Sequence, residues 1–146
     1  MGLDMYLTAE KYLPTYKPEG KKQSETIKAI VEASYPVESV KVRLAYWRKA
    51  NQIHNWFVEN VQNGVDECQT VYVSKEKLEE LLKVVNEVLE NHSKAEKLLP
   101  TTSGFFFGST EYNKDYFSDL KETKEQLEKI LASDLGDWSI EYHSSW

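Results

Sequence analysis

The chain has 146 residues, a length that suits one domain with one hydrophobic core. It is 40% hydrophobic and 29% charged, which argues against wholesale disorder, and its net charge of −6 disfavours generic binding to nucleic-acid backbones. The only cysteine, Cys68, excludes an internal disulfide and a cysteine-based zinc cluster, and no apolar run approaches the roughly 18 residues of a membrane span. We therefore expect a cytoplasmic protein with no membrane association, no metal and no other cofactor.

The first third of the chain predicts two strands separated by an irregular segment. Residues 3–8 alternate apolar with more polar side chains, which indicates a strand. Residues 12–23 are rich in Pro, Gly and Lys and predict a loop, after which Ser24 is the expected N-cap of a short helix over 24–34. Residues 40–46 alternate again and are the clearest strand of the sequence.

The middle of the chain predicts a central helix over 47–63, with Gly64 placed to end it. The short β-prone run 70–73 follows as a strand. Ser74 then caps a long amphipathic helix that we expect to reach residue 92. This second helix has one leucine- and valine-rich stripe and one charged face, so its predicted role is structural.

The last third contains three consecutive phenylalanines, Phe105–Phe107, between two glycines. This pattern favours a strand that is buried on both faces. A final helix ending at residue 131 and a strand over 138–142 complete the pattern. The whole chain therefore predicts a single α+β (mixed α/β) domain over residues 1–146, with a four- to five-stranded sheet covered by about three helices.

The central helix supplies the best single candidate for chemistry. On a helical wheel His54 falls inside the apolar face, where an imidazole would be partly desolvated, as general acid–base residues often are. The alternative is a core histidine satisfied by a backbone carbonyl or by Asn51. His92 and His143 are expected at the surface, so a three-histidine metal site is not predicted.

One edge of the same helix offers a set of groups suited to an anionic or nucleotide-like ligand. Arg48, Asn51 and Asn55 supply a guanidinium fork and two amides, and Trp47 beside them supplies a ring for stacking. The predicted partners on the Phe-rich segment are placed opposite this edge: Phe106, Ser109 and Tyr112. The competing interpretations are a solvated helix edge and phenylalanines that only fill the core.

Three blocks of the sequence carry a family resemblance: MGLDMYL at the start, YWRKANQIHNWFVENVQ in the middle and LLPTTSGFFFGS after it. Together they resemble a family of small uncharacterised proteins of bacteria and their phages. The segment 11–39 has no counterpart in these blocks and is interpreted as a variable insertion. The resemblance implies an intracellular setting and carriage by phages, and it transfers no activity or residue role.

We weigh three hypotheses for function. The first is a non-enzymatic binding protein that sequesters a small anionic or nucleotide-like ligand, which in a phage would suit a counter-defence sponge. The second is an enzyme that acts on a nucleotide-like substrate with His54 as acid–base residue. The third is a homodimeric protein-interaction module, with Trp56 at the interface or packed beneath a strand.

Overall fold

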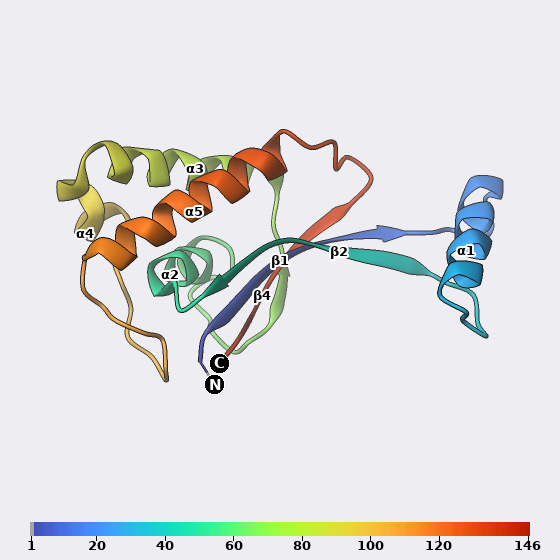
Figure 1. Ribbon diagram of the computed structural model, residues 1–146, viewed down its shortest axis with the longest axis horizontal. Helices are drawn as coiled ribbons and strands as arrows, with labels where there is room; N and C mark the ends of the chain where they lie inside the picture. The colour runs from blue at the N-terminus through green and yellow to red at the C-terminus, as the bar shows by residue number, and fades with distance from the viewer. Residues whose placement is uncertain (1) are drawn as a thin grey trace.

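The computed structural model describes residues 2–146 as a single α+β domain, with one antiparallel four-stranded sheet in the order β2-β1-β4-β3 (Figure 1). The elements along the chain are β1 (Asp4–Tyr12), α1 (Pro18–Ile30), β2 (Ser39–Arg48), α2 (Asn51–Asn60), β3 (Thr70–Tyr72), α3 (Lys75–Glu90), a 3-10 turn (His92–Lys94), α4 (Ala95–Leu98), α5 (Lys114–Leu131) and β4 (Ser139–Ser145). Within this part of the chain, no helix combines the length and the apolar character that crossing a bilayer requires. The predicted fold class and the predicted number of strands are confirmed.

One face of the sheet carries the core. Met5 and Leu7 of β1, together with Leu3 just before it, point toward the helices and are fully buried, whereas the alternating positions Asp4 and Tyr6 lie on the opposite face and keep some exposure. The same core contains side chains from the three principal helices α2, α3 and α5. Burial of each large aliphatic side chain contributes about 1.5–3 kcal/mol, so this single face supplies most of the stabilisation.

The two long helices form where their patterns predict. In α3 the Ser74 hydroxyl accepts a hydrogen bond from the Lys77 backbone N–H, which is the expected N-cap. Helix α5 begins after Asn113, whose side-chain oxygen accepts from the backbone N–H groups of Asp115 and Tyr116. Each helix buries one apolar stripe in the core. Figure 1 shows the two helices lying beside each other.

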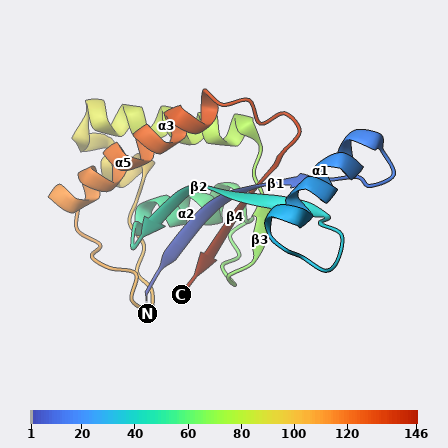
Figure 2. The same cartoon turned by 45° about the vertical axis from the view of Figure 1, so that its right-hand side comes forward.

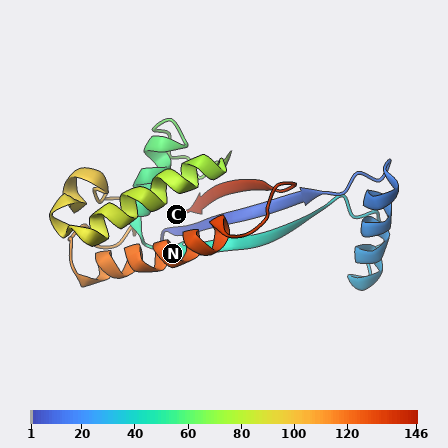
Figure 3. The ribbon, with the colours of Figure 1, turned by 90° about the horizontal axis from the view of Figure 1, so that it is seen from above.

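Helix α1 does not join this core. It lies at the far end of a long ribbon made by the outer parts of β1 and β2, as Figures 2 and 3 show from two further sides. We call residues 9–42 the arm. The prediction of a loop over 12–23 was wrong in its second half, because α1 starts at Pro18, a residue whose fixed φ suits a first helical turn. Position 20 in this turn requires glycine, because a Cβ there would lie 2.3 Å from the Pro14 carbonyl oxygen.

The predicted start of the central helix at residue 47 was also wrong. Strand β2 continues through Trp47 and Arg48, which pair with Met5 and Asp4 of β1. Lys49 then adopts a left-handed φ of 58°, and α2 begins only at Asn51. At residues 47 and 48, where the strand pattern and the helix pattern overlap, the chain therefore forms the strand.

The segment with three phenylalanines is a loop, in contrast to the predicted buried strand. We call residues 101–110 the Phe-rich loop. Phe106 has a left-handed φ of 56° at a turn, and Phe105 and Phe106 are 66% and 52% exposed. Only Phe107 enters the core, where it is 5% exposed. Two large apolar side chains are thus presented at the surface.

Candidate functional site

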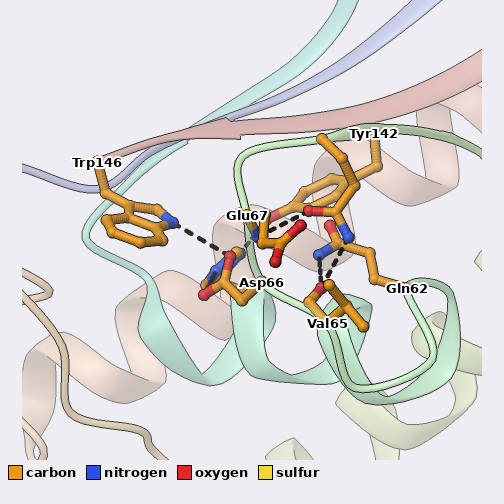
Figure 4. A network of polar contacts seen from close by, with 8 residues as sticks. Gln62, Val65, Asp66, Glu67, Tyr142 and Trp146 are labelled. Atoms are coloured by element: carbon orange, nitrogen blue, oxygen red, sulfur yellow. Dashed lines mark hydrogen bonds and ion pairs between the residues drawn. The ribbon is translucent and has the colours of Figure 1, made fainter.

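His54 lies at the centre of a buried hydrogen-bond network that joins α2, the loop after it and β4 (Figure 4). Its side chain has no exposed surface. Nδ1 lies 2.6 Å from the Tyr142 hydroxyl, and Nε2 lies 2.9 Å from Asp66 Oδ2. Both ring nitrogens therefore have partners, as a buried imidazole requires.

The partners of His54 fix the position of its proton. Burial raises the pKa of the Tyr142 phenol well above its usual value, so the hydroxyl keeps its hydrogen. Since Nδ1 is its only hydrogen-bond partner within residues 2–146, the hydroxyl donates to Nδ1. With Nδ1 as the acceptor, the ring hydrogen lies on Nε2 and donates to the Asp66 carboxylate. In this chain of bonds Asp66 is the member that reaches solvent, with 26% of its side chain exposed.

Asp66 is held in place by the loop that leaves α2. The Val65 carbonyl oxygen accepts hydrogen bonds from two side-chain amides, those of Gln62 at 2.7 Å and Gln69 at 2.8 Å (Figure 4). Gln69 Oε1 also accepts from the Glu67 backbone N–H at 2.8 Å. These bonds close the loop on both sides of Asp66, so its carboxylate is presented by an ordered backbone.

The second oxygen of Asp66 accepts a hydrogen bond from the indole N–H of Trp146 at 3.1 Å. The Trp146 ring packs edge to face against Phe107, with ring centroids 6.0 Å apart, and remains 45% exposed. A carboxylate offers about four acceptor sites, of which His54 and Trp146 use two. Asp66 thus keeps acceptor capacity on both oxygens.

A cleft of about 340 Å³ opens beside this network, a volume within the range of small-ligand sites. It lies between α2 and the Phe-rich loop, where we expected a site. Its lining comprises His54, Asn55, Val58, Glu59, Asp66, Thr102, Ser103, Gly104, Phe105, Phe107 and Trp146. Three aromatic rings and two carboxylates therefore face a common space.

Asn51 fixes the Phe-rich loop over the cleft. Its amide nitrogen donates to the backbone carbonyls of Phe107 and Ser109, at 3.0 and 2.9 Å, and its oxygen accepts from the Thr102 N–H at 3.0 Å. The Asn51 side chain is buried, so these three bonds replace those it would make with water. Its role is to position the loop.

The structure separates the residues that the sequence grouped into one site. His54 and Asn55 line the cleft. Asn51 bonds to the Ser109 carbonyl as part of the three hydrogen bonds that fix the Phe-rich loop, which we call the Asn51 clamp. The other four residues of the predicted site lie outside the cleft and are placed as follows.

Trp47 is 2% exposed and donates its indole N–H to Thr123 of α5, so it belongs to the core. Arg48 forms an ion pair with Asp4 at 2.9 Å on the sheet face opposite the helices. The Phe106 carbonyl and the Arg48 guanidinium both lie close to Gly2, away from the cleft lining. The Tyr112 hydroxyl accepts from the Thr101 N–H at 3.2 Å at the base of the loop.

The acidic and aromatic lining residues missing from the predicted site are Asp66, Trp146, Phe105, Phe107 and Glu59. The sequence contained one usable signal for Asp66. A histidine inside an apolar face needs a polar partner, and Asp66 is an acidic residue in the turn directly after the same helix. Trp146 is brought to the site by the pairing of β4 with β1, which the local pattern does not reveal.

A larger surface groove of about 740 Å³ lies between the start of α3 and the end of α5. Its charged lining residues are Lys75 and Asp134, and it contains none of the network described above. Across residues 2–146 there is also no cluster of three or more side chains suited to hold a metal ion. We therefore take the cleft beside Asp66 as the candidate site, because it combines a cavity with pre-positioned polar groups.

Comparisons of this chain with protein-family models, with curated proteins and with solved structures give no match.

Proposed function

We propose that this protein is a binding protein that holds a small ligand in the cleft between α2 and the Phe-rich loop. The observation that carries the proposal is the Asp66 carboxylate, which His54 and Trp146 hold in one orientation at a cleft walled by aromatic rings. A site whose polar group is fixed before the ligand arrives loses little conformational entropy on binding. Pre-positioning of this kind suits sequestration of a ligand.

The charge of the cleft refines the kind of ligand. Its charged groups are the carboxylates of Glu59 and Asp66, and no lysine or arginine within residues 2–146 contributes to its lining. A free phosphate or carboxylate would therefore meet repulsion there. A nucleotide-like ligand fits if its base enters the cleft and its phosphate stays in solvent, and in a phage the protein would then act as a sponge for such a ligand in the host cytoplasm.

The environment of His54 favours a binding function over an enzyme in which His54 is the acid–base residue. A general base needs a nitrogen within hydrogen-bond reach of the substrate, whereas both nitrogens of His54 are engaged and its side chain is fully buried. Its arrangement suits a positioning role toward Asp66. Mass spectrometry of candidate nucleotides after incubation with the protein tests the enzymatic alternative, which requires a product that is absent with His54→Ala.

A homodimeric interaction module is the second candidate, and the arm supplies its support. Tyr16, Ile30 and Tyr35 are 78%, 74% and 81% exposed there, although large apolar side chains are usually covered. Trp56 does not serve this role, because it is 7% exposed and packs against Phe57. Light scattering at increasing concentrations tests the alternative, which requires a dimer mass that falls to the monomer mass when Tyr16 and Tyr35 are replaced by Ser.

Native mass spectrometry of the protein purified from bacterial cells tests the binding proposal. The test variant is Ser103→Trp, which places an indole in the cleft, and the matched control is Ser118→Trp on the exposed side of α5. We expect a bound small molecule, released intact on denaturation, with the wild type and the control and none with Ser103→Trp. Equal retention of the molecule by Ser103→Trp would place the ligand elsewhere and contradict the proposal.

A further inference from the structure

The acceptor geometry of the cleft identifies a class of ligand, and this step rests on the proposed function. We infer that the cleft recognises a planar group with two adjacent N–H donors, as found in a guanidinium ion and in the Watson–Crick edge of guanine. Asp66 would accept both hydrogen bonds, and the neighbouring aromatic rings would contact the flat faces of the group.

The first support is the state of the Asp66 carboxylate. Each oxygen already accepts one hydrogen bond, Oδ2 from His54 and Oδ1 from Trp146, so neither oxygen can rotate freely. Each oxygen retains a further acceptor site. A pair of parallel N–H groups matches two carboxylate oxygens in a bidentate contact, which is the geometry seen between arginine and carboxylates.

The second support comes from the walls of the cleft. Phe105 and Trp146 both line it and are 66% and 45% exposed, so flat ring surface is accessible to a ligand. Planar guanidinium groups and nucleobases are both stabilised by contact with aromatic rings. Glu59 adds a second negative charge at the same cleft, which favours a cation or a donor-rich edge over an acceptor-rich one.

His54 and Tyr142 would act as positioning residues in this recognition. Tyr142 donates to Nδ1 and thereby keeps the His54 hydrogen on Nε2, where it faces Asp66. The Tyr142–His54 bond is buried, so water does not compete for Nδ1 and the donor that reaches Asp66 stays in place. Neither residue needs to touch the ligand.

Isothermal titration with four probes tests this inference. Agmatine carries a guanidinium ion, guanosine carries two adjacent N–H donors on its base, inosine lacks the 2-amino donor, and adenosine lacks the donor pair. We expect guanosine to bind at least tenfold more tightly than inosine and adenosine, because loss of one charge-assisted hydrogen bond removes about that factor. Binding of agmatine alone would assign the donor pair to a cationic ligand, and binding of guanosine alone would assign it to a nucleobase.

The matched variants are Asp66→Asn and Glu67→Gln. Asp66→Asn replaces the acceptor pair by one acceptor and one donor and should weaken the bound probe at least tenfold, whereas Glu67 lies outside the cleft lining and its variant should bind as the wild type does. The comparison of guanosine with inosine needs no variant, so the test holds even if Asp66→Asn fails to fold.

Absence of binding by both agmatine and guanosine at millimolar concentration would overturn the inference, as would binding of guanosine, inosine and adenosine with equal affinities. In either case a ligand that native mass spectrometry finds with the wild type and not with Ser103→Trp would leave the proposed function standing. Failure of the proposed function would instead appear as equal retention of the ligand by Ser103→Trp and the wild type.

Discussion

Tyr142→Phe isolates the buried hydrogen bond on which the site depends. The substitution removes one hydroxyl and retains the ring, which stacks on Phe57 with centroids 4.0 Å apart. It leaves Nδ1 of His54 buried without a donor, and an unsatisfied buried polar atom costs about 1–3 kcal/mol. With a urea dependence of about 1–3 kcal/mol per molar, the unfolding midpoint should fall by roughly 1 M.

A double-mutant cycle with His54→Leu shows whether the cost belongs to this bond. In His54→Leu the buried Tyr142 hydroxyl has lost its own partner, so Tyr142→Phe should be neutral or stabilising in that background. The expected coupling is about 1–3 kcal/mol in the free energy of unfolding. Tyr72→Phe on β3 is the matched control, because Tyr72 is 76% exposed and should change stability by less than about 0.5 kcal/mol. A coupling energy indistinguishable from that of the control would refute a stabilising bond between Tyr142 and His54 and, with it, the positioning role of His54.

Three further changes test the Asn51 clamp, the half-buried Asp119 carboxyl and the arm. Asn51→Asp should lower the free energy of unfolding by about 2–4 kcal/mol in urea titrations and expose the Phe-rich loop to proteolysis, because a carboxylate would face two backbone carbonyls in place of the amide donor. Burial raises the pKa of Asp119 from 3.8 to about 6, so the folded state binds this proton more tightly, and the resulting stability is present below pH 4 and lost as pH rises through 6. Asp119→Asn should therefore add about 1 kcal/mol at pH 7, after allowance for solvent screening, and reduce the fall in stability between pH 4 and 6 in urea titrations. Replacement of the arm between Leu13 and Glu38 by Asn-Gly, a turn suited to a two-residue hairpin, should leave the thermal unfolding temperature of the domain within a few degrees, because the hydrophobic core contains no side chain from α1.

Each of these three predictions has an outcome that would contradict it. The control for Asn51→Asp is Asn63→Asp at an exposed left-handed position, and equal losses of stability for the two would show that the clamp does not hold the loop. Asp137→Asn at an exposed position is the control for Asp119→Asn, and an unchanged pH profile for Asp119→Asn would place the raised pKa on another group. Cooperative unfolding of the shortened chain at a much lower temperature would show that residues 14–37 are an integral part of the domain.

The elements that the sequence predicted well are those with a local cause. Helix α3 has an N-cap at Ser74 and a regular apolar stripe, so its pattern alone was sufficient. The first strand was predicted from strict alternation, and its partners in the sheet confirm the face assignments of Leu3 and Met5. The fold class followed from the order of such elements.

The errors arose where one stretch carries two periodicities or a single backbone conformation decides the outcome. Trp47 and Arg48 fit both a strand and a helix, and pairing with β1 selected the strand. In the Phe-rich loop, the left-handed Phe106 prevents the extended conformation that its composition favours, and Asn51 compensates with three hydrogen bonds from another element. The site was only half found, because Asp66 and Trp146 reach His54 through the tertiary fold and leave no repeat or spacing in the sequence.

The measurement that tests the central claim most directly is the nuclear magnetic resonance spectrum of the four tryptophan indole N–H groups during addition of a small-molecule extract of bacterial cells. We predict that the Trp146 signal moves, because its indole lines the cleft, while the signals of Trp47 and Trp56 in the core stay in place. The Trp146 shift should disappear with Ser103→Trp. An extract that leaves Trp146 unchanged in the wild type, or that moves it equally in Ser103→Trp, would contradict a ligand site in this cleft.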